Sequence, residues 1–177
     1  MDVGHVGIHV CDFELMLGFY QRVFDFVISD IKRGESRSIV FLTSEPTLHH
    51  QLVLATGRER DDRSRVINQV SFRVKTLADL RRIHAALMKE TVSDMHVITH
   101  GTAWSVYFRD PEGNRFEAFV DTPWYVDQPF RTPIDLSKSD EELRRDTENL
   151  CRALPGFQSF ASWTEALVQR FHSAKRS

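Results

Sequence analysis

The residues of this chain that could do chemistry centre on one carboxylate, Glu117, in the stretch Trp104–Asp121 (WSVYFRDPEGNRFEAFVD). Apolar, aromatic-rich runs flank Asp110–Asn114, where proline, glycine and asparagine favour a turn, so the stretch predicts a β-hairpin. Side chains alternate along a strand, and Glu117 therefore points away from the apolar face of the returning strand. A carboxylate in this position is either solvated on an open sheet face or held in a cup where it does chemistry.

The elements that must position Glu117 begin with a strand and a helix. Residues 5–10 (HVGIHV) alternate as in a half-buried strand, with His5 opposite the apolar face. Asp12 can cap a helix over residues 13–24, with Leu15, Phe19, Tyr20 and Val23 at helical spacing. Three further strands are predicted, at 26–31, 38–43 and 49–55. The charged stretch 57–64 (GRERDDRS) indicates an exposed linker.

The same order then repeats. Residues 69–74 (QVSFRV) alternate like the first strand, with Gln69 in the place of His5. A helix over residues 76–90 follows, and its apolar stripe comprises Leu77, Leu80, Ile83, Leu87 and Met88. Three more strands are predicted, near 96–99 and at 105–109 and 115–121. The sequence therefore predicts two tandem β-α-β-β-β units.

Two such units can join so that their uncovered sheet faces curl toward each other. The predicted fold class is α+β, a half-open mixed-sheet cup of residues 1–121, with units at about 4–56 and 66–121. Several polar side chains fall on the strand positions that would line this cup: His5, His49, His50, Gln51, Gln69 and Glu117. The polar positions thus coincide with the cup.

The composition changes after residue 121, and residues 122–177 are predicted to be a C-terminal extension. Prolines break up its first part: Pro123, Pro129 and Pro133. Ser139 begins a helix that is expected to run to about Leu154. A second short helix is expected after Ser162, where Glu165 completes a capping-box pattern.

Bulk composition narrows the classes of partner. The chain has 177 residues, a net charge of −2, 41% hydrophobic residues and 27% charged residues. This balance gives no electrostatic argument for nucleic acid or for an anionic membrane, and favours a small molecule or a protein partner. Two cysteines without metal-ligand spacing fit a reducing compartment. Without an apolar run of about 20 residues or a visible export signal, we expect a cytoplasmic protein.

Three motifs in this chain resemble the vicinal oxygen chelate (glyoxalase/bleomycin resistance/extradiol dioxygenase) superfamily, over about residues 4–121. They are HVGIHVCDFELMLGFY at the start, NQVSFRV in the middle and DPEGNRFE near the end. The stretches HHQLVLA and HGTAWSVYFRDPEG are most similar to small extradiol dioxygenases, which open the rings of catechols and dihydroxybiphenyls. The resemblance therefore implies a ring-cleaving enzyme with a small aromatic substrate and dioxygen.

The resemblance also implies a metal site. That subfamily holds Fe(II) with two histidines and one carboxylate, leaving positions open for a catecholate and dioxygen. By position, the ligands implied here are His5, Gln69 and Glu117, with Gln69 where the second histidine stands. A glutamine oxygen is a harder and usually weaker ligand than imidazole. One divalent ion is expected, Fe(II) first, with Mn(II), Zn(II) and Ni(II) as alternatives.

Other residues match functional positions of the extradiol pattern. His50 matches the acid/base that takes the catechol proton, and Tyr107 a phenol that hydrogen-bonds substrate oxygen. Substrate-binding positions are implied for His49, Gln51, His100 and Trp104. Strict alternation opposes His50 and Gln51 facing the cup together, unless His50 lies at the strand entrance or beside a bulge.

Two other classes of function remain open. A glyoxalase-like isomerase or lyase would use the same metal without dioxygen or Tyr107. A metal-free, drug-sequestering protein would use the cup as an aromatic-lined pocket. Structural roles for single residues also stay open, such as core packing for Trp104 and a surface position for His50. We further expect a homo-oligomer, a dimer.

Overall fold

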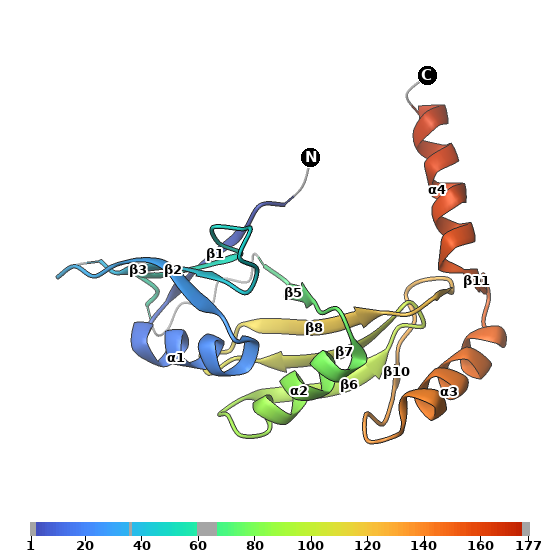
Figure 1. The fold of residues 1–177 in the computed structure, drawn as a ribbon, viewed down its shortest axis with the longest axis horizontal. Helices are drawn as coiled ribbons and strands as arrows, with labels where there is room; N and C mark the ends of the chain where they lie inside the picture. Colours follow the sequence, from blue (N-terminus) through green and yellow to red (C-terminus); the bar gives the residue numbers. More distant parts are fainter. Residues whose placement is uncertain (1–2, 36, 60–66, 175–177) are drawn as a thin grey trace. The chain divides into compact units, whose positions relative to one another are not determined.

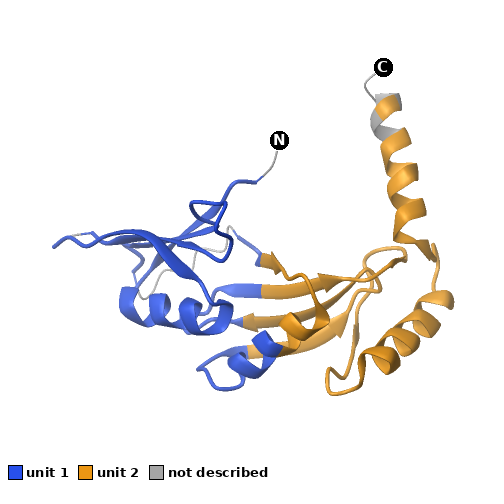
Figure 2. Ribbon diagram, in the orientation of Figure 1, with its two compact units in different colours: residues 1–70, 82–93, 109–116 blue, residues 71–81, 94–108, 117–177 orange. Residues whose placement is uncertain are grey.

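The computed structural model describes residues 3–35, 37–59 and 67–174, and part of the predicted linker 57–64 lies outside them (Figure 1). The chain forms two compact units (Figure 2). The first comprises Met1–Val70, Arg82–Ser93 and Arg109–Phe116, and the second comprises Ser71–Arg81, Asp94–Phe108 and Glu117–Ser177. The predicted α+β class with mixed sheets is confirmed.

The first unit contains a four-stranded mixed sheet in the order β1-β4-β3-β2. Its strands are β1 (Val6–Val10), β2 (Val27–Lys32), β3 (Ile39–Thr43) and β4 (Leu52–Thr56). β1 runs parallel to β4, whereas β3 pairs antiparallel with both β2 and β4. The predicted strand at 49–55 begins three residues too early, because β4 starts only at Leu52.

Helix α1 (Phe13–Phe24) confirms the helix predicted after the first strand. The Asp12 side chain accepts a hydrogen bond from the Leu15 backbone N–H and so caps the helix. The buried face comprises Phe13, Met16, Leu17, Phe19, Tyr20, Val23 and Phe24. Leu15 is 45% exposed, and its predicted place in the apolar stripe is wrong because the buried stripe centres on Met16, Phe19 and Tyr20.

The second sheet has five strands in the order β10-β6-β7-β8-β5. These are β5 (Val70–Arg73), β6 (Ser93–Thr99), β7 (Ala103–Arg109), β8 (Arg115–Asp121) and β10 (Thr132–Pro133). Helix α2 (Leu77–Leu87) buries Leu77, Leu80, Ile83 and Leu87, as predicted. Met88 follows the helix and is 64% exposed, so its predicted core position is wrong.

The turn between β7 and β8 confirms the predicted hairpin. Asp110 and Asn114 close the turn through a backbone hydrogen bond, and Gly113 adopts a φ of 82°, which favours glycine. Asp110 is 2% exposed and accepts a hydrogen bond from the buried Tyr20 hydroxyl at 2.8 Å. Glu112 accepts hydrogen bonds from the backbone N–H groups of Cys11 and Asp12 at the start of α1. These hydrogen bonds hold the turn residues in the first unit, to which Cys11, Asp12 and Tyr20 also belong.

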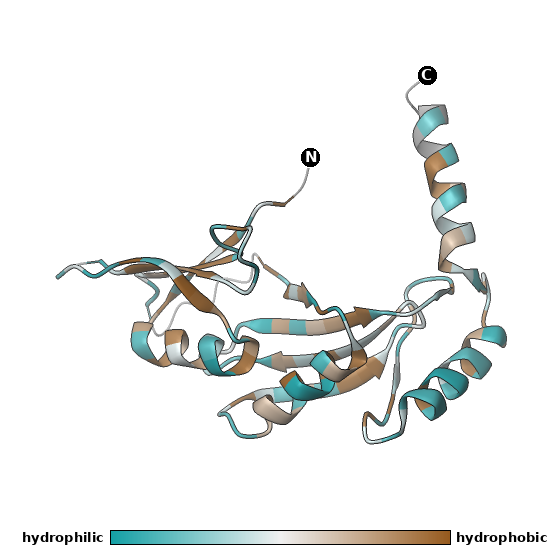
Figure 3. Ribbon diagram, in the orientation of Figure 1, coloured by the Kyte–Doolittle hydropathy of each residue, from teal (hydrophilic) through white to brown (hydrophobic). Residues whose placement is uncertain are grey.

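Residues after 121 contribute to the second unit. β9 (Trp124–Tyr125) pairs with β11 (Gln158–Ser159), and β10 extends the five-stranded sheet beside β6. Helix α3 (Asp140–Arg152) begins with a capping box of Ser139 and Glu142, which confirms the predicted start. It is largely hydrophilic in Figure 3 and buries Leu143, Thr147 and Cys151.

Helix α4 (Phe160–Ala174) begins two residues before Ser162, the start predicted from the sequence. The reason is a different cap, because the Ser159 hydroxyl accepts the hydrogen bond from the Ser162 N–H. The helix spans 15 residues and is therefore not the short helix expected. Within the described ranges, no helix is long and apolar enough to cross a membrane.

Candidate functional site

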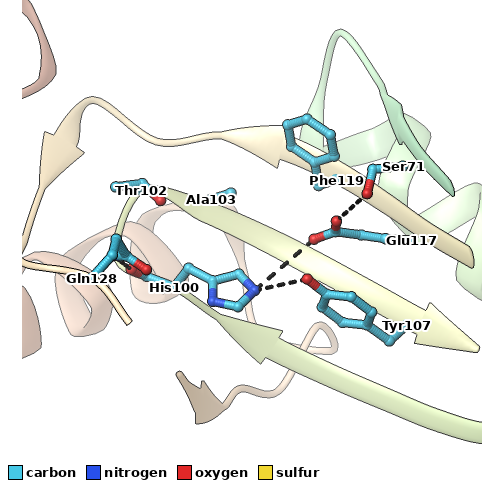
Figure 4. Close-up of a pocket in the computed structure, with 8 residues that line it drawn as sticks. All are labelled: Ser71, His100, Thr102, Ala103, Tyr107, Glu117, Phe119 and Gln128. Carbon is cyan, nitrogen blue, oxygen red and sulfur yellow. Dashed lines mark hydrogen bonds and ion pairs between the residues drawn. The ribbon is translucent and has the colours of Figure 1, made fainter. Parts of the chain in front are cut away.

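The second unit contains a pocket of about 350 Å³ (Figure 4). Its wall is formed by Ser71, His100, Thr102, Ala103, Tyr107, Glu117, Phe119 and Gln128. β7 contributes Ala103 and Tyr107, which lie on the same face of that strand. β8 contributes Glu117 and Phe119, which likewise share one face. The wall combines apolar side chains with a few polar groups, as the walls of small-molecule sites do.

Glu117 supplies a buried carboxylate to the pocket. The residue is only 6% exposed, which excludes the solvated alternative considered for it. The Ser71 hydroxyl donates a hydrogen bond to Oε2 at 2.6 Å, and Oε1 lies 4.0 Å from Nε2 of His100. Ser71 therefore orients the carboxylate so that Oε1 faces the imidazole across the pocket (Figure 4).

His100 and Tyr107 form a hydrogen-bonded pair beside Glu117. The Tyr107 hydroxyl lies 3.0 Å from Nε2 of His100, and Nδ1 of the same ring lies 2.7 Å from the backbone oxygen of Phe130. A carboxylate, an imidazole and a phenol thus meet in one pocket. Such groups can bind a polar aromatic ligand and exchange protons with it.

A buried hydroxyl lies on the same strand face. Ser105 lies between Ala103 and Tyr107 on that face of β7 and is fully buried. Among the described residues, its Oγ is the buried side-chain polar atom without a hydrogen-bond partner. Buried polar atoms are normally satisfied by protein, water or ligand, so an unsatisfied one beside the pocket residues is compatible with a bound polar group.

The first unit brings together three histidines that were predicted as site residues, His5, His49 and His50. The His5 and His50 ring centroids are 4.2 Å apart, and the His49 and His50 Nδ1 atoms are 2.8 Å apart. Partial burial, followed by the neighbouring charges of His5 and His49, lowers the pKa of His50. A lowered pKa keeps His50 neutral near pH 7 and able to accept a proton.

The position of His50 resolves the alternation problem. His50 and Gln51 both precede β4, so the pleat of that strand does not force them onto opposite faces. Gln51 turns its side chain toward the β3 end, where Oε1 accepts hydrogen bonds from the Ser44 backbone N–H and hydroxyl. His50 therefore lies beside His5 and His49, whereas the Gln51 side chain is hydrogen-bonded to the loop residue Ser44.

The proposed metal ligands are divided between the units. His5 and Gln69 belong to the first and Glu117 to the second. Over the residues described, neither unit alone assembles three or more His, Cys, Asp or Glu side chains in a metal-binding arrangement. The donor types nevertheless fit a divalent ion, because a buried carboxylate is stabilised by a cation and imidazole and amide oxygen are suitable ligands.

Trp104 lies outside the pocket wall. It alternates with Ala103 and is buried on the other side of the strand, where its Nε1 donates a hydrogen bond to the Thr147 hydroxyl of α3 at 2.9 Å. Its ring also packs edge-on against Trp124. This arrangement is a core contact between β7 and the segment that follows the sheet.

Five lining residues are not among the site residues predicted from the sequence: Ser71, Thr102, Ala103, Phe119 and Gln128. Ser71 shares the alternating face of Gln69 and Phe119 that of Glu117, so the strand period was a signal for both. Thr102 and Gln128 lie in irregular segments, which carry no such period.

Comparison with known proteins identifies the family. The model of the Glyoxalase/Bleomycin resistance protein/Dioxygenase superfamily matches residues 2–118. The chain belongs to this superfamily. A curated relative, biphenyl-2,3-diol 1,2-dioxygenase 2 of Rhodococcus globerulus, is 27% identical over 121 residues, which are 66% of this chain and 61% of that protein. The chain thus spans less than two thirds of the length of this relative.

Solved structures share the fold. A glyoxalase/bleomycin resistance protein/dioxygenase domain from Frankia sp. EAN1pec has a TM-score of 0.57 and 23% identity, covering 69% of this chain and 98% of that one. The fosfomycin resistance protein FosX of Listeria monocytogenes, solved with Mn(II) and sulfate, has a TM-score of 0.55 and 16% identity, covering 68% and 93%. The aligned region of these structures confirms the fold class.

Proposed function

We propose that this protein is a metal-dependent, extradiol-type dioxygenase that opens the ring of a catechol-type aromatic diol. The observation that carries the proposal is the meeting of Glu117, His100 and Tyr107 in one pocket of about 350 Å³. The relative from Rhodococcus globerulus, a biphenyl-2,3-diol dioxygenase, supports the choice of substrate class.

The proposed metal ligands are Glu117, His5 and Gln69. Fe(II) is the first choice, with Mn(II), Zn(II) and Ni(II) as alternatives, and the Mn(II) in the FosX structure supports a divalent ion. When bound, the metal would orient diol and dioxygen and carry charge between them. Ser71 would hold Glu117 in its liganding orientation, because its hydroxyl donates a hydrogen bond to Oε2 while Oε1 faces His100.

His50 is the proposed base. Its lowered pKa makes the ring neutral at pH 7, so it can take a proton from the diol hydroxyl. Tyr107 is proposed to hydrogen-bond a substrate oxygen. His100, which is hydrogen-bonded to the Tyr107 hydroxyl, is proposed to line the substrate site beside it. Phe119 adds an aromatic surface to the wall against which a ring can pack.

A second candidate is a glyoxalase-like isomerase or lyase. Gln69 at a ligand position favours this candidate, because it removes one of the two imidazoles of the iron site. The fosfomycin resistance proteins that share the fold are consistent with it. Such an enzyme would consume no dioxygen and would not depend on the Tyr107 hydroxyl.

The test is oxygen uptake and ring-cleavage absorbance with a panel of catechols and dihydroxybiphenyls, using protein loaded anaerobically with Fe(II). We expect turnover by the parent, loss of turnover in Glu117→Gln, and retention in the matched control Asp121→Asn. Asp121 ends the same strand but is exposed and paired with Arg73. Absence of oxygen uptake, together with conversion of a glutathione hemithioacetal, would favour the second candidate.

We further propose that the protein acts in the cytoplasm as a dimer. Neither Cys11 nor Cys151, both within the described residues, forms a disulfide bond, which fits a reducing compartment. Sedimentation analysis tests the dimer, since a concentration-independent monomer would contradict it.

A further inference from the structure

The loop that carries His100 is held by the segment that follows the sheet, residues 122–130. The Gln128 side-chain amide donates hydrogen bonds to the backbone oxygens of His100 at 2.8 Å and Val126 at 3.2 Å. Its Oε1 accepts a hydrogen bond from the Phe130 backbone N–H at 3.3 Å. The amide orientation is fixed by these partners, because only its N–H groups can donate to the two carbonyls.

The same segment determines which nitrogen of His100 carries the proton. Nδ1 lies 2.7 Å from the Phe130 backbone oxygen, and a carbonyl oxygen can only accept. Nδ1 must therefore be protonated, which leaves Nε2 of the neutral ring as an acceptor. The Tyr107 hydroxyl, 3.0 Å away, then donates its hydrogen to Nε2.

We propose that Gln128 is a positioning residue of the active site, which holds Phe130 against His100 and thereby fixes His100 as its Nδ1–H tautomer. The assignment of the His100 tautomer does not depend on the proposed function. Only the expected effect of Gln128 on turnover rests on the proposed function. Gln128 also lines the pocket, so the predicted C-terminal extension, residues 122–177, contributes to the wall of the site. A change of tautomer would turn Nε2 into a donor and reverse the hydrogen bond with Tyr107.

Other contacts keep the loop in place when Gln128 is changed. The Thr122 backbone N–H donates to the Thr102 oxygen at 2.9 Å, and the Thr122 hydroxyl donates to the Gly101 oxygen. The His100 N–H donates to the Ala103 oxygen at 3.0 Å. Gln128 itself is exposed at the pocket mouth. A substitution there is thus expected to alter the imidazole more than the fold.

The discriminating variant is Gln128→Glu. It keeps the side-chain shape and an acceptor for Phe130, but places a carboxylate oxygen opposite two carbonyls that need a donor. The matched control is Gln158→Glu on β11, in the same unit and outside the pocket wall. Long-range 1H–15N correlation spectra of the histidine rings report the tautomer directly, and a His100→Gln sample assigns the signal.

We expect Nδ1–H for His100 in the parent and in Gln158→Glu, and a loss of that single tautomer in Gln128→Glu. In diol turnover we expect Gln128→Glu to lose roughly three- to tenfold in kcat/KM, the scale of one lost hydrogen bond. An Nε2–H ring in the parent, or an unchanged tautomer in folded Gln128→Glu, would overturn the inference. The expected spectra without turnover by any protein would refute the proposed function and leave the positioning role intact.

Discussion

Replacing Tyr20 with phenylalanine tests how the turn between β7 and β8 is held in the first unit. Asp110 accepts two hydrogen bonds on each carboxylate oxygen. The donors are the Tyr20 hydroxyl, the Glu112 N–H, and the backbone and side-chain N–H groups of Asn114. Tyr20→Phe removes one donor at 2.8 Å and keeps the ring that packs on Phe116.

The expected cost follows from the charge and burial of the acceptor. A hydrogen bond to a charged group contributes about 1.5–3 kcal/mol, and Tyr20 and Asp110 are both buried, so we expect Tyr20→Phe to lower the free energy of unfolding by that amount at pH 7. Guanidinium unfolding measures the difference. A double-mutant cycle that combines Tyr20→Phe with Asp110→Asn isolates the coupling energy between these two side chains.

The pH dependence of stability provides a second test of the Tyr20–Asp110 hydrogen bond. Burial raises the pKa of Asp110, while hydrogen bonds from Asn114 and Tyr20 lower it. A raised pKa means that the folded state holds the proton more tightly, so stability falls as pH rises from the ordinary value through the folded pKa. Loss of the Tyr20 hydroxyl raises that pKa further. The loss of unfolding free energy in Tyr20→Phe should therefore be complete above the pKa of Asp110 in the folded protein and become smaller below it. A loss under about 0.5 kcal/mol at pH 7, or a loss that grows as the pH falls, would refute the reasoning.

Three further substitutions have defined outcomes. Glu112→Gln should lower unfolding free energy by about 1–2 kcal/mol, because its carboxylate binds two N–H groups at the start of α1; an unchanged denaturation midpoint would contradict this. Trp104→Phe should cost about 1–3 kcal/mol in denaturant unfolding through loss of the Thr147 hydrogen bond, yet leave KM for the diol unchanged; a large rise in KM would place Trp104 in the substrate site after all. Gln69→His should bind Fe(II) more tightly and cleave diols faster in the oxygen assay, because imidazole is the better ligand; equal or lower activity would remove support for Gln69 as a ligand.

Local signals predicted most of the fold. The Asp12 cap, the turn at Asp110–Asn114 and the Ser139 capping box each satisfy backbone groups within a few residues, and all three are confirmed. The errors at Leu15 and Met88 occur at the edges of helical stripes. There, spacing alone does not say which flank of the stripe faces the core.

The site was predictable only as far as the strand period reaches. Alternation along β8 places Glu117 and Phe119 on one face, and the same rule would have added Ser71. Gln128 and Phe130 reach His100 from 28 and 30 residues away, through bonds between an irregular segment and a loop. No periodic pattern encodes such contacts, so the tautomer of His100 and its supports required the three-dimensional structure.

The most direct test of the central claim is the metal content of protein purified without oxygen. We predict about one divalent ion per chain in the parent and in Asp121→Asn, and its loss in Glu117→Ala. Iron would support ring cleavage, and another divalent ion would move the assignment toward the glyoxalase-like candidate. No bound metal in any of the three proteins, even after Fe(II) is added back, would contradict both enzymatic proposals.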